Sequence, residues 1–218
     1  MIPITIASVG LDFDDVLVDT FPLVMWKIKR TAEVMGLEVP DDERIASCYD
    51  YAREMCQRLF PEASADKFLE IYYAVDIPYR PVDGAKEALD FLSSSGVMIW
   101  TFTGARTREL VRQRSIQAGI DPSLLYLIIT GAETRPYKKP HRKAWEICRR
   151  EIRTSGIEPE KALFVEDSLE NYHRARESGL QAVLLLGSPN SRGYEHHVPP
   201  EDVLHSMRQL PEFALRRY

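Results

Sequence analysis

Four aspartates stand within ten residues near the start of the chain, in the stretch LDFDDVLVDT at positions 11–20. The apolar run ITIASVGL before them predicts a buried strand that ends at about Asp12. Neighbouring carboxylates repel one another and lose solvation when they are buried, so this position requires compensating partners. Carboxylates so placed can act as nucleophile, general acid or base, or metal ligand. The stretch therefore predicts a reactive or metal-binding site at the end of the first strand.

Further polar residues follow other predicted strands. Thr103 and Gly104 end the run at 97–103, and Glu166 with Asp167 ends the run at 162–167. Lys139 precedes a proline at a predicted helix start. The carboxyl ends of parallel strands meet at one crevice, so we expect these side chains to converge. Carboxylates suit Mg²⁺, whereas a hydroxyl, an ammonium and backbone N–H groups suit a phosphoryl group.

The elements that would hold these residues alternate between strand and helix. Apolar runs with little polar alternation are typical of strands covered on both faces, and helical patterns ending at glycines separate the later ones. This alternation predicts an α/β fold, a doubly wound parallel sheet of five strands. The predicted strands are residues 4–13, 97–103, 124–130, 162–167 and 182–187.

Residues 20–79 interrupt this alternation. Apolar positions recur there at helical spacing, with one helix from about Thr20, a second at 43–59 and a third at 67–75. The segment contains no convincing strand pattern. We therefore expect two domains: an α/β core of residues 1–19 and 80–218, and an all-helical domain of residues 20–79 inserted above the strand ends.

Composition narrows the classes of function. The chain has 218 residues, of which 44% are hydrophobic, and a net charge of −5, which argues against a nucleic-acid partner. No apolar run is long enough to cross a bilayer, and no signal peptide is evident. Cys48, Cys56 and Cys148 form no C-x-x-C pair, which favours reduced thiols and a cytoplasmic setting. The sequence leaves monomer and dimer both open.

The motifs resemble those of a known family. D-x-D-D-V-L at the first strand end, then T-G, K-P and E-D-S-x-x-N in that order, resemble the haloacid dehalogenase (HAD) superfamily of aspartate-nucleophile hydrolases. The branch with the best resemblance contains phosphoglycolate phosphatases and β-phosphoglucomutases. The helical insertion resembles the small helical cap of that branch, and EDVLHSMRQL (201–210) resembles its terminal helix. The resemblance covers nearly the whole chain.

This resemblance implies roles in phosphoryl transfer. Asp12 would be the nucleophile that forms an aspartyl phosphate. Asp14 would be the general acid for the leaving group and then the base that activates water. Thr103 and Gly104 would bind the phosphoryl group, and Lys139 would neutralise its developing charge. We expect the surrounding carboxylates to raise the pKa of Asp14 and keep it protonated for the first step.

The resemblance also implies a Mg²⁺ site. Its ligands would be the Asp12 carboxylate, the Asp14 backbone carbonyl and the Asp167 carboxylate. Glu166 would contribute directly, through water, or only as a structural acid. Asn171 occupies a position where the family often has a second acid, so it would orient Asp167 or Lys139, or simply lie on the helix surface.

Several nearby residues have simpler explanations. Asp15 replaces a glycine that is frequent in this motif, and Asp19 is expected to cap the helix that follows. Thr101 and Lys138 compete with Thr103 and Lys139 but match the family pattern less well. Some side chains of the insertion could contact substrate, although aromatic residues at helical spacing usually belong to a core. These are Trp26, Arg30, Tyr49, Arg53, Tyr72 and Tyr73.

The expected function is a Mg²⁺-dependent phosphatase acting on a small phosphorylated metabolite. A phosphomutase would use the same residues and is the main alternative. A haloacid dehalogenase would lack the second aspartate of the first motif, here Asp14, because a leaving halide needs no proton. A phosphoacceptor signalling module would place its aspartate after the third strand and would have no helical insertion.

Overall fold

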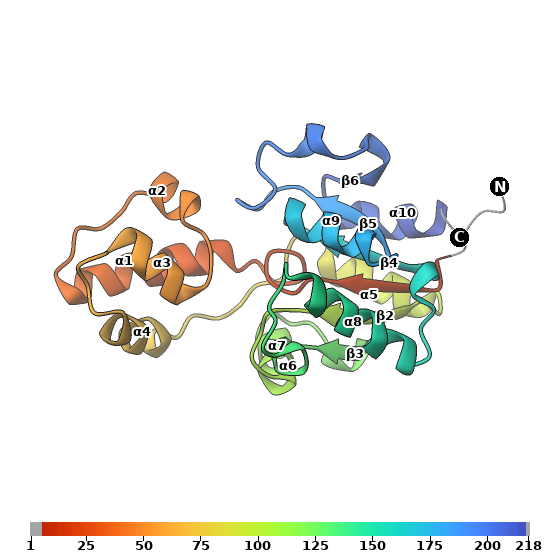
Figure 1. Ribbon diagram of the computed structural model, residues 1–218, viewed down its shortest axis with the longest axis horizontal. Coiled ribbons are helices and arrows are strands. Elements are labelled where there is room, and N and C mark those ends of the chain that lie inside the picture. Colours follow the sequence, from red (N-terminus) through yellow and green to blue (C-terminus); the bar gives the residue numbers. More distant parts are fainter. Residues whose placement is uncertain (1–5, 217–218) are drawn as a thin grey trace. The chain divides into compact units, whose positions relative to one another are not determined.

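The computed structural model describes residues 6–216. Positions 4 and 5 of the predicted first strand, and the chain ends at 1–3 and 217–218, lie outside the described residues. The chain divides into two compact units, one formed by residues 1–19 and 79–218 and the other by residues 20–78. The first is an α/β unit and the second is entirely helical (Figure 1).

The α/β unit contains a parallel sheet with the strand order β3-β2-β1-β4-β5-β6. The prediction of an α/β fold with a parallel sheet is confirmed, and each of the five predicted runs contains a strand. A sixth strand of two residues extends the edge beside β5. The strands are β1 (Ser8–Leu11), β2 (Met98–Phe102), β3 (Leu125–Ile129), β4 (Ala162–Glu166), β5 (Gln181–Leu185) and β6 (Val203–Leu204).

The sixth strand lies in the segment that resembled a terminal helix. Residues 200–209 form a 3₁₀ turn, β6 and a second 3₁₀ turn, and the helix begins only at Leu210. Leu204 is almost fully buried, and its carbonyl accepts a hydrogen bond of 2.8 Å from Leu186 N–H. Pairing with β5 therefore replaces the expected helical hydrogen bonds. The expectation of a helix over 201–210 was therefore wrong: this segment contains β6, and the helix follows it.

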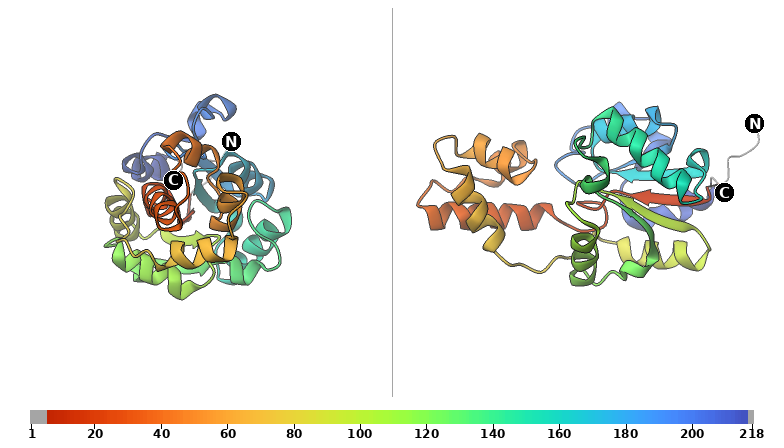
Figure 2. Two further views of the ribbon diagram at one scale, coloured as in Figure 1. Left: turned by 90° about the vertical axis from the view of Figure 1, so that its left-hand side faces the viewer. Right: turned by 60° about the horizontal axis from the view of Figure 1, so that its bottom comes forward.

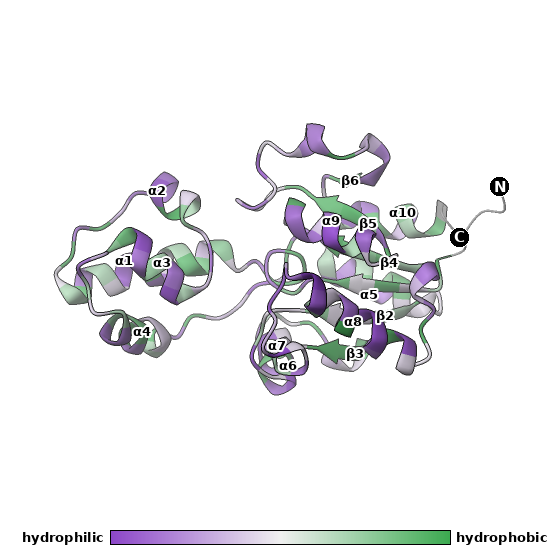
Figure 3. Cartoon of the chain, viewed as in Figure 1, coloured by the Kyte–Doolittle hydropathy of each residue, from purple (hydrophilic) through white to green (hydrophobic). Residues whose placement is uncertain are grey.

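Helices cover both faces of the sheet (Figure 2). Successive residues of a strand point to opposite faces, so Leu163 and Val165 join one apolar cluster while Phe164 joins the other. Figure 3 shows hydrophobic strands between helices that carry both hydrophobic and hydrophilic residues. The first cluster packs against α5 (Ala85–Ser94), α6 (Arg108–Gln117) and α10 (Leu210–Arg216). The second packs against α8 (Arg142–Thr154) and α9 (Leu169–Glu177), and the short α7 (Gly131–Thr134) follows β3.

The helical unit is held together by its own apolar cluster. The expected helix at 43–59 is two helices, because Asp50 Oδ1 accepts a hydrogen bond from Tyr51 N–H and Tyr51 begins the second helix with extended backbone. The first helix has Thr20, not Asp19, at its N-cap. The unit consists of α1 (Phe21–Met35), α2 (Asp42–Ser47), α3 (Ala52–Leu59) and α4 (Ala65–Ala74).

The aromatic residues of the helical unit differ in burial. Tyr72 is buried, as expected of a core residue, but Trp26 and Tyr73 are each more than half exposed. All three cysteines are free thiols. Within residues 6–216, none of the helices has both the length and the apolar character needed to span a bilayer.

Candidate active site

The sheet fixes the backbone of three candidate segments at one edge. Asp12 directly follows β1, and its N–H donates to Val165 O at 2.9 Å. Thr103 directly follows β2, and its N–H donates to Ile129 O at 3.0 Å. Glu166 is the last residue of β4. Ladder hydrogen bonds thus place carboxylate, hydroxyl and carboxylate on neighbouring strands.

A cluster of three carboxylates and one ammonium lies at this edge. Ligand oxygens of Asp12, Glu166 and Asp167 all lie within 4.8 Å of one another, and all three residues are buried. Lys139 Nζ lies 2.9 Å from Asp12 Oδ1 and 2.8 Å from Glu166 Oε2. The structure therefore brings together four of the predicted site residues, which are separated by up to 155 positions in the sequence (12 to 167).

Burial and mutual repulsion dominate the electrostatics of this cluster. Burial raises the pKa of Asp12, and the charge of Asp167 adds to this shift, although Lys139 opposes it. Burial and the charge of Asp12 raise the pKa of Glu166 well above its usual range. Burial disfavours the Lys139 ammonium, but Asp12 and Glu166 outweigh this effect and raise the pKa of Lys139. With every group ionised, three negative charges and one positive charge leave a net charge of about −2.

Three aromatic rings surround the Lys139 ammonium. Its Nζ lies 5.3 Å from the ring centroid of Phe102, 5.6 Å from that of Phe164 and 5.8 Å from that of Trp145. The Trp145 ring meets the other two edge to face. A cation is attracted to ring faces at such distances, so the rings hold the ammonium while excluding water. This enclosure was not predicted from the sequence, because its rings come from two strands and a helix.

The turn after β1 gives Asp14 its position. Asp14 forms an isolated β-bridge with Val18, and Val18 bridges Pro81 on the segment that returns from residues 20–78. Asp15 has φ 58°, in the left-handed region, and its N–H donates to Val18 O at 2.7 Å. Glycine adopts this conformation without cost and aspartate tolerates it, which explains why either residue suits the position.

The carboxyl group of Asp14 has a different neighbour from the one expected. It is not a member of the carboxylate cluster found among the described residues, and its Oδ1 lies 3.7 Å from Arg114 Nη1. The Arg114 guanidinium stacks over the Tyr79 ring at 5.0 Å. The close carboxylate cluster is found at Asp12, Glu166 and Asp167, and the raised pKa expected of Asp14 stays a prediction. Arg114 was not predicted, since nothing in its local sequence distinguishes it from other arginines of α6.

The two threonines and the two lysines that compete for the same roles differ in their burial and hydrogen bonds. Thr101 is buried within β2, and its hydroxyl donates to Leu11 O at 2.8 Å. Thr103 Oγ1 accepts a hydrogen bond from Ala105 N–H at 3.1 Å, which leaves its hydroxyl proton available for a ligand oxygen. Gly104 beside it is exposed. Lys138 is exposed, whereas the Lys139 side chain is 7% exposed.

Asp167 is oriented by a loop that the sequence analysis did not single out. Ser188 Oγ donates to Asp167 Oδ2 at 2.6 Å, and Asn190 Nδ2 donates to the same oxygen at 3.1 Å. In the described part of the chain, no hydrogen bond joins Asn171 to Asp167 or Lys139. The Asn171 Oδ1 atom is buried without a partner there.

The cluster also offers a test of whether a divalent cation fits. Glu166 is fully buried, yet its Oε1 has no hydrogen-bond partner among the described residues. A buried carboxylate oxygen normally has a partner, and three carboxylates beside a single ammonium need a further counter-charge when they ionise. Oxygen ligands with one adjacent lysine suit a hard cation such as Mg²⁺. The donor set therefore fits such an ion.

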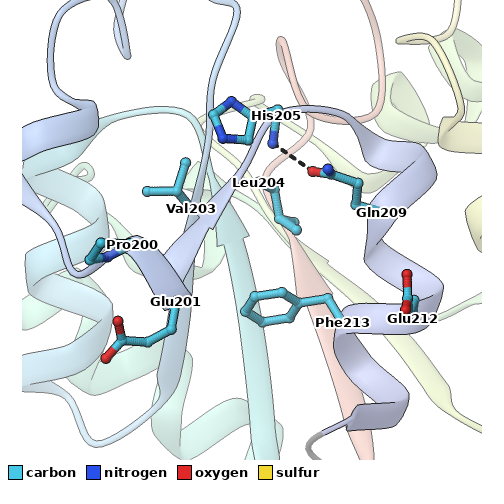
Figure 4. Close-up of a pocket in the computed structure, with 8 residues that line it drawn as sticks. All are labelled: Pro200, Glu201, Val203, Leu204, His205, Gln209, Glu212 and Phe213. Atoms are coloured by element: carbon cyan, nitrogen blue, oxygen red, sulfur yellow. Dashed lines mark hydrogen bonds between the residues drawn. The ribbon is translucent and has the colours of Figure 1, made fainter.

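A separate hollow lies beside β6, with a volume of about 480 Å³ (Figure 4). The hollow contains none of the candidate residues and brings no carboxylate cluster together. Its lining consists of Pro200, Glu201, Val203, Leu204, His205, Gln209, Glu212 and Phe213. The candidate residues therefore lie outside this hollow, and what they share is buried charge.

Comparisons with known proteins agree with this arrangement. The model of the family described as haloacid dehalogenase-like hydrolase matches residues 10–185. A phosphoglycolate phosphatase of Nitrosococcus oceani is 25% identical over 223 residues, covering 92% of each chain.

Two solved structures share the fold. A predicted phosphoglycolate phosphatase from Haemophilus somnus is 20% identical, with a TM-score of 0.77, over 94% of this chain and 96% of that chain. A structure from Thermotoga maritima, assigned as a β-phosphoglucomutase, is 20% identical, with a TM-score of 0.74, over 96% and 98%.

Proposed function

The chain belongs to the haloacid dehalogenase-like hydrolase family, and we propose that it is a phosphatase that hydrolyses a small phosphate monoester through an aspartyl phosphate on Asp12. The observation that carries this proposal is the Lys139 ammonium between Asp12 and Glu166, with Asp14 two residues beyond Asp12. The relative from Nitrosococcus oceani, a phosphoglycolate phosphatase, supports the same class of reaction.

In the first step, an Asp12 carboxylate oxygen would attack phosphorus and displace the alcohol oxygen of the ester. Asp14 would donate its proton to that oxygen, so that a neutral alcohol leaves. Lys139 would offset the negative charge shared by Asp12 and the phosphoryl oxygens, and Thr103 with Gly104 would bind those oxygens. The Asp12 carboxylate would thus act on the side of phosphorus where the new bond forms, and the Asp14 carboxyl on the side where the alcohol leaves.

In the second step, Asp14 would take a proton from water as that water attacks the phosphorus of the aspartyl phosphate. The bond to the Asp12 oxygen would break, releasing inorganic phosphate and restoring both aspartates. The balance is one ester and one water consumed, with one alcohol and one phosphate formed.

A bound Mg²⁺ would be held by the Asp12 and Asp167 carboxylates and the Asp14 backbone carbonyl, with Glu166 directly or through water. It would supply charge that stabilises the phosphoryl oxygens and offsets the repulsion within the cluster. By analogy with the family, the helical unit would act as a cap that admits small phosphate esters in preference to macromolecules.

The test is phosphate release from a panel of monoesters, including phosphoglycolate, sugar phosphates and nucleoside monophosphates, with Mg²⁺ and with a chelator. We expect release only with the cation, and a loss of about 10⁴-fold in Asp12→Asn because the nucleophile is removed. Asp19→Asn, an exposed aspartate of the same stretch, is the matched control and should retain full activity. Full activity in Asp12→Asn, or no release from any ester, would overturn the proposal.

A phosphomutase is the alternative, because it would use the same residues and because the Thermotoga maritima structure shares the fold. The Glu166–Asp167 pair suits both reactions and does not decide between them. In that case a hydroxyl of a second sugar phosphate would attack the aspartyl phosphate in place of water. Phosphorus NMR of the products distinguishes the two, because a mutase yields an isomerised sugar phosphate with little free phosphate.

A further inference from the structure

The loop after β5 directs two hydrogen-bond donors at one oxygen of a candidate metal ligand. Ser188 Oγ and Asn190 Nδ2 both donate to Asp167 Oδ2, at 2.6 Å and 3.1 Å. Asp167 is 2% exposed, so water competes little with these contacts. Among the described residues, no hydrogen bond reaches the other oxygen, Oδ1. The two oxygens of this carboxylate are therefore not equivalent.

The loop is itself held in place. Asn190 N–H donates to Ser188 Oγ at 3.1 Å, so the hydroxyl is already an acceptor and its single proton is committed to Asp167. The neighbouring Ser191 is almost fully buried. Its Oγ accepts from Gly187 N–H at 3.1 Å and donates to Ser188 O at 3.2 Å. The donors are thus positioned before any ligand binds.

Two donors on Oδ2 limit how Asp167 can coordinate a cation. A carboxylate oxygen that accepts two hydrogen bonds has few lone-pair directions left for a metal. Mg²⁺ requires a compact octahedron in which carboxylates usually contribute one oxygen each, whereas Ca²⁺ readily takes both oxygens and six to eight ligands in total. Restricting Asp167 to Oδ1 would therefore disfavour Ca²⁺ more than Mg²⁺.

We propose that Ser188 and Asn190 are positioning residues that confine Asp167 to one-oxygen coordination and so make the site selective for Mg²⁺ over Ca²⁺. The inference rests on the metal site of the proposed function. It deepens that function by assigning the choice of cation to a loop outside the four motifs.

The test is isothermal titration of the metal-free full-length protein with MgCl₂ and with CaCl₂, which needs no turnover. In Ser188→Ala and Asn190→Ala we expect Mg²⁺ to bind about 10- to 100-fold more weakly, as for other residues that orient metal ligands. We expect Ca²⁺ to lose less affinity than Mg²⁺, so that the ratio of the two dissociation constants shifts toward Ca²⁺. Ser188→Thr, which keeps the hydroxyl, should restore both values.

Ser94→Ala, a change of the same type at an exposed helix end, should behave like the unaltered protein. Unchanged Mg²⁺ affinity in both loop variants, or an equal loss for the two cations, would overturn the inference and leave the metal site intact. An unaltered protein that binds neither cation would instead overturn the metal site, and this inference with it. Thermal unfolding in chelator identifies any variant that fails to fold. If Ser188→Ala does not fold, the Mg²⁺ and Ca²⁺ affinities of Asn190→Ala and Ser188→Thr, which keeps the hydroxyl, are compared instead.

Discussion

Both compact units have apolar cores, but the α/β unit also buries a cluster of charged side chains. At the sheet edge of the α/β unit, Asp12, Glu166 and Asp167 are buried around a single lysine. In the helical unit the centre is apolar, and Ile28 and Phe68 are fully buried there. Burying like charges costs free energy, whereas burying apolar side chains stabilises a fold.

This difference separates the residues that stabilise the protein from those that would carry out its chemistry. Proteins retain buried charges that oppose folding mainly where a reaction or a ligand requires them. We therefore expect substitutions in the charge cluster to change activity, with or without a change of stability, and substitutions in the apolar centre of the helical unit to change stability alone. The following predictions test that division.

The largest effect is expected for Lys139→Met. The change removes the charge that offsets Asp12 and Glu166, so the rate of phosphate release should fall by about 10²- to 10³-fold, as for other groups that stabilise developing charge. Breaking a buried ion pair from one side should also cost about 3–5 kcal/mol of unfolding free energy. Steady-state kinetics and denaturant unfolding measure the two effects.

Lys138→Met provides the matched control, since Lys138 is exposed and directly precedes Lys139 in the sequence. It should leave both rate and stability near those of the unaltered protein. A Lys139→Met enzyme that kept its rate within about twofold would contradict the assignment of Lys139 to the reaction.

The next effect concerns the helical unit alone. Phe68→Ala leaves a cavity beside Phe60 and Tyr72, whose rings lie 5.6 Å and 5.9 Å from that of Phe68. It should lower the free energy of unfolding by about 3–5 kcal/mol. Mg²⁺ affinity, measured at low temperature where the variant is folded, should not change.

Tyr73→Ala, on the same helix but more than half exposed, should cost less than about 1 kcal/mol. If Phe68→Ala weakened Mg²⁺ binding in the folded protein, the apolar centre would influence the charge cluster, and the division between the units would fail.

The sequence predicted the structural features that depend on local residue patterns. Apolar runs and glycine stops located β1 to β5, and the residues following those strands met at one edge because parallel strands share a direction. It did not predict β6, since two residues carry no measurable periodicity and pair only because β5 offers an edge. The break between α2 and α3 was also missed, because Asp50 accepts from its neighbour's N–H where the helical pattern would continue.

Contacts between loops and helices that are distant in the sequence were not predicted either. Arg114 approaches Asp14 from the last turn of α6, and Ser188 reaches Asp167 from a loop 21 residues further along the chain. In both cases the residue type is ordinary for its element, and only the folded path of the backbone brings the partners together. Motif order predicted which groups would react, but it carried no information on the groups that contact them.

The smallest effect is a dependence of stability on pH that belongs to the charge cluster alone. Burial and the charge of Asp12 raise the pKa of Glu166 well above 4.5, so the folded protein keeps a proton that the unfolded chain has released. In chelator, the free energy of unfolding should therefore fall as pH rises from the ordinary titration range of a glutamate toward the raised pKa of Glu166. Because the pKa of Lys139 is raised, its ammonium stays charged across this window and adds no slope.

Glu166→Gln removes this ionisation and should flatten the decline, as measured by denaturant unfolding at each pH. Glu170→Gln, an exposed acid in the first turn of α9, should keep the slope of the unaltered protein. Phe68→Ala should lower the whole curve without changing its slope, since no titrating group is altered. An equal slope in Glu166→Gln and the unaltered protein would show that burial of Glu166 does not oppose folding. The contrast between a charged edge and an apolar centre would then lose its energetic basis.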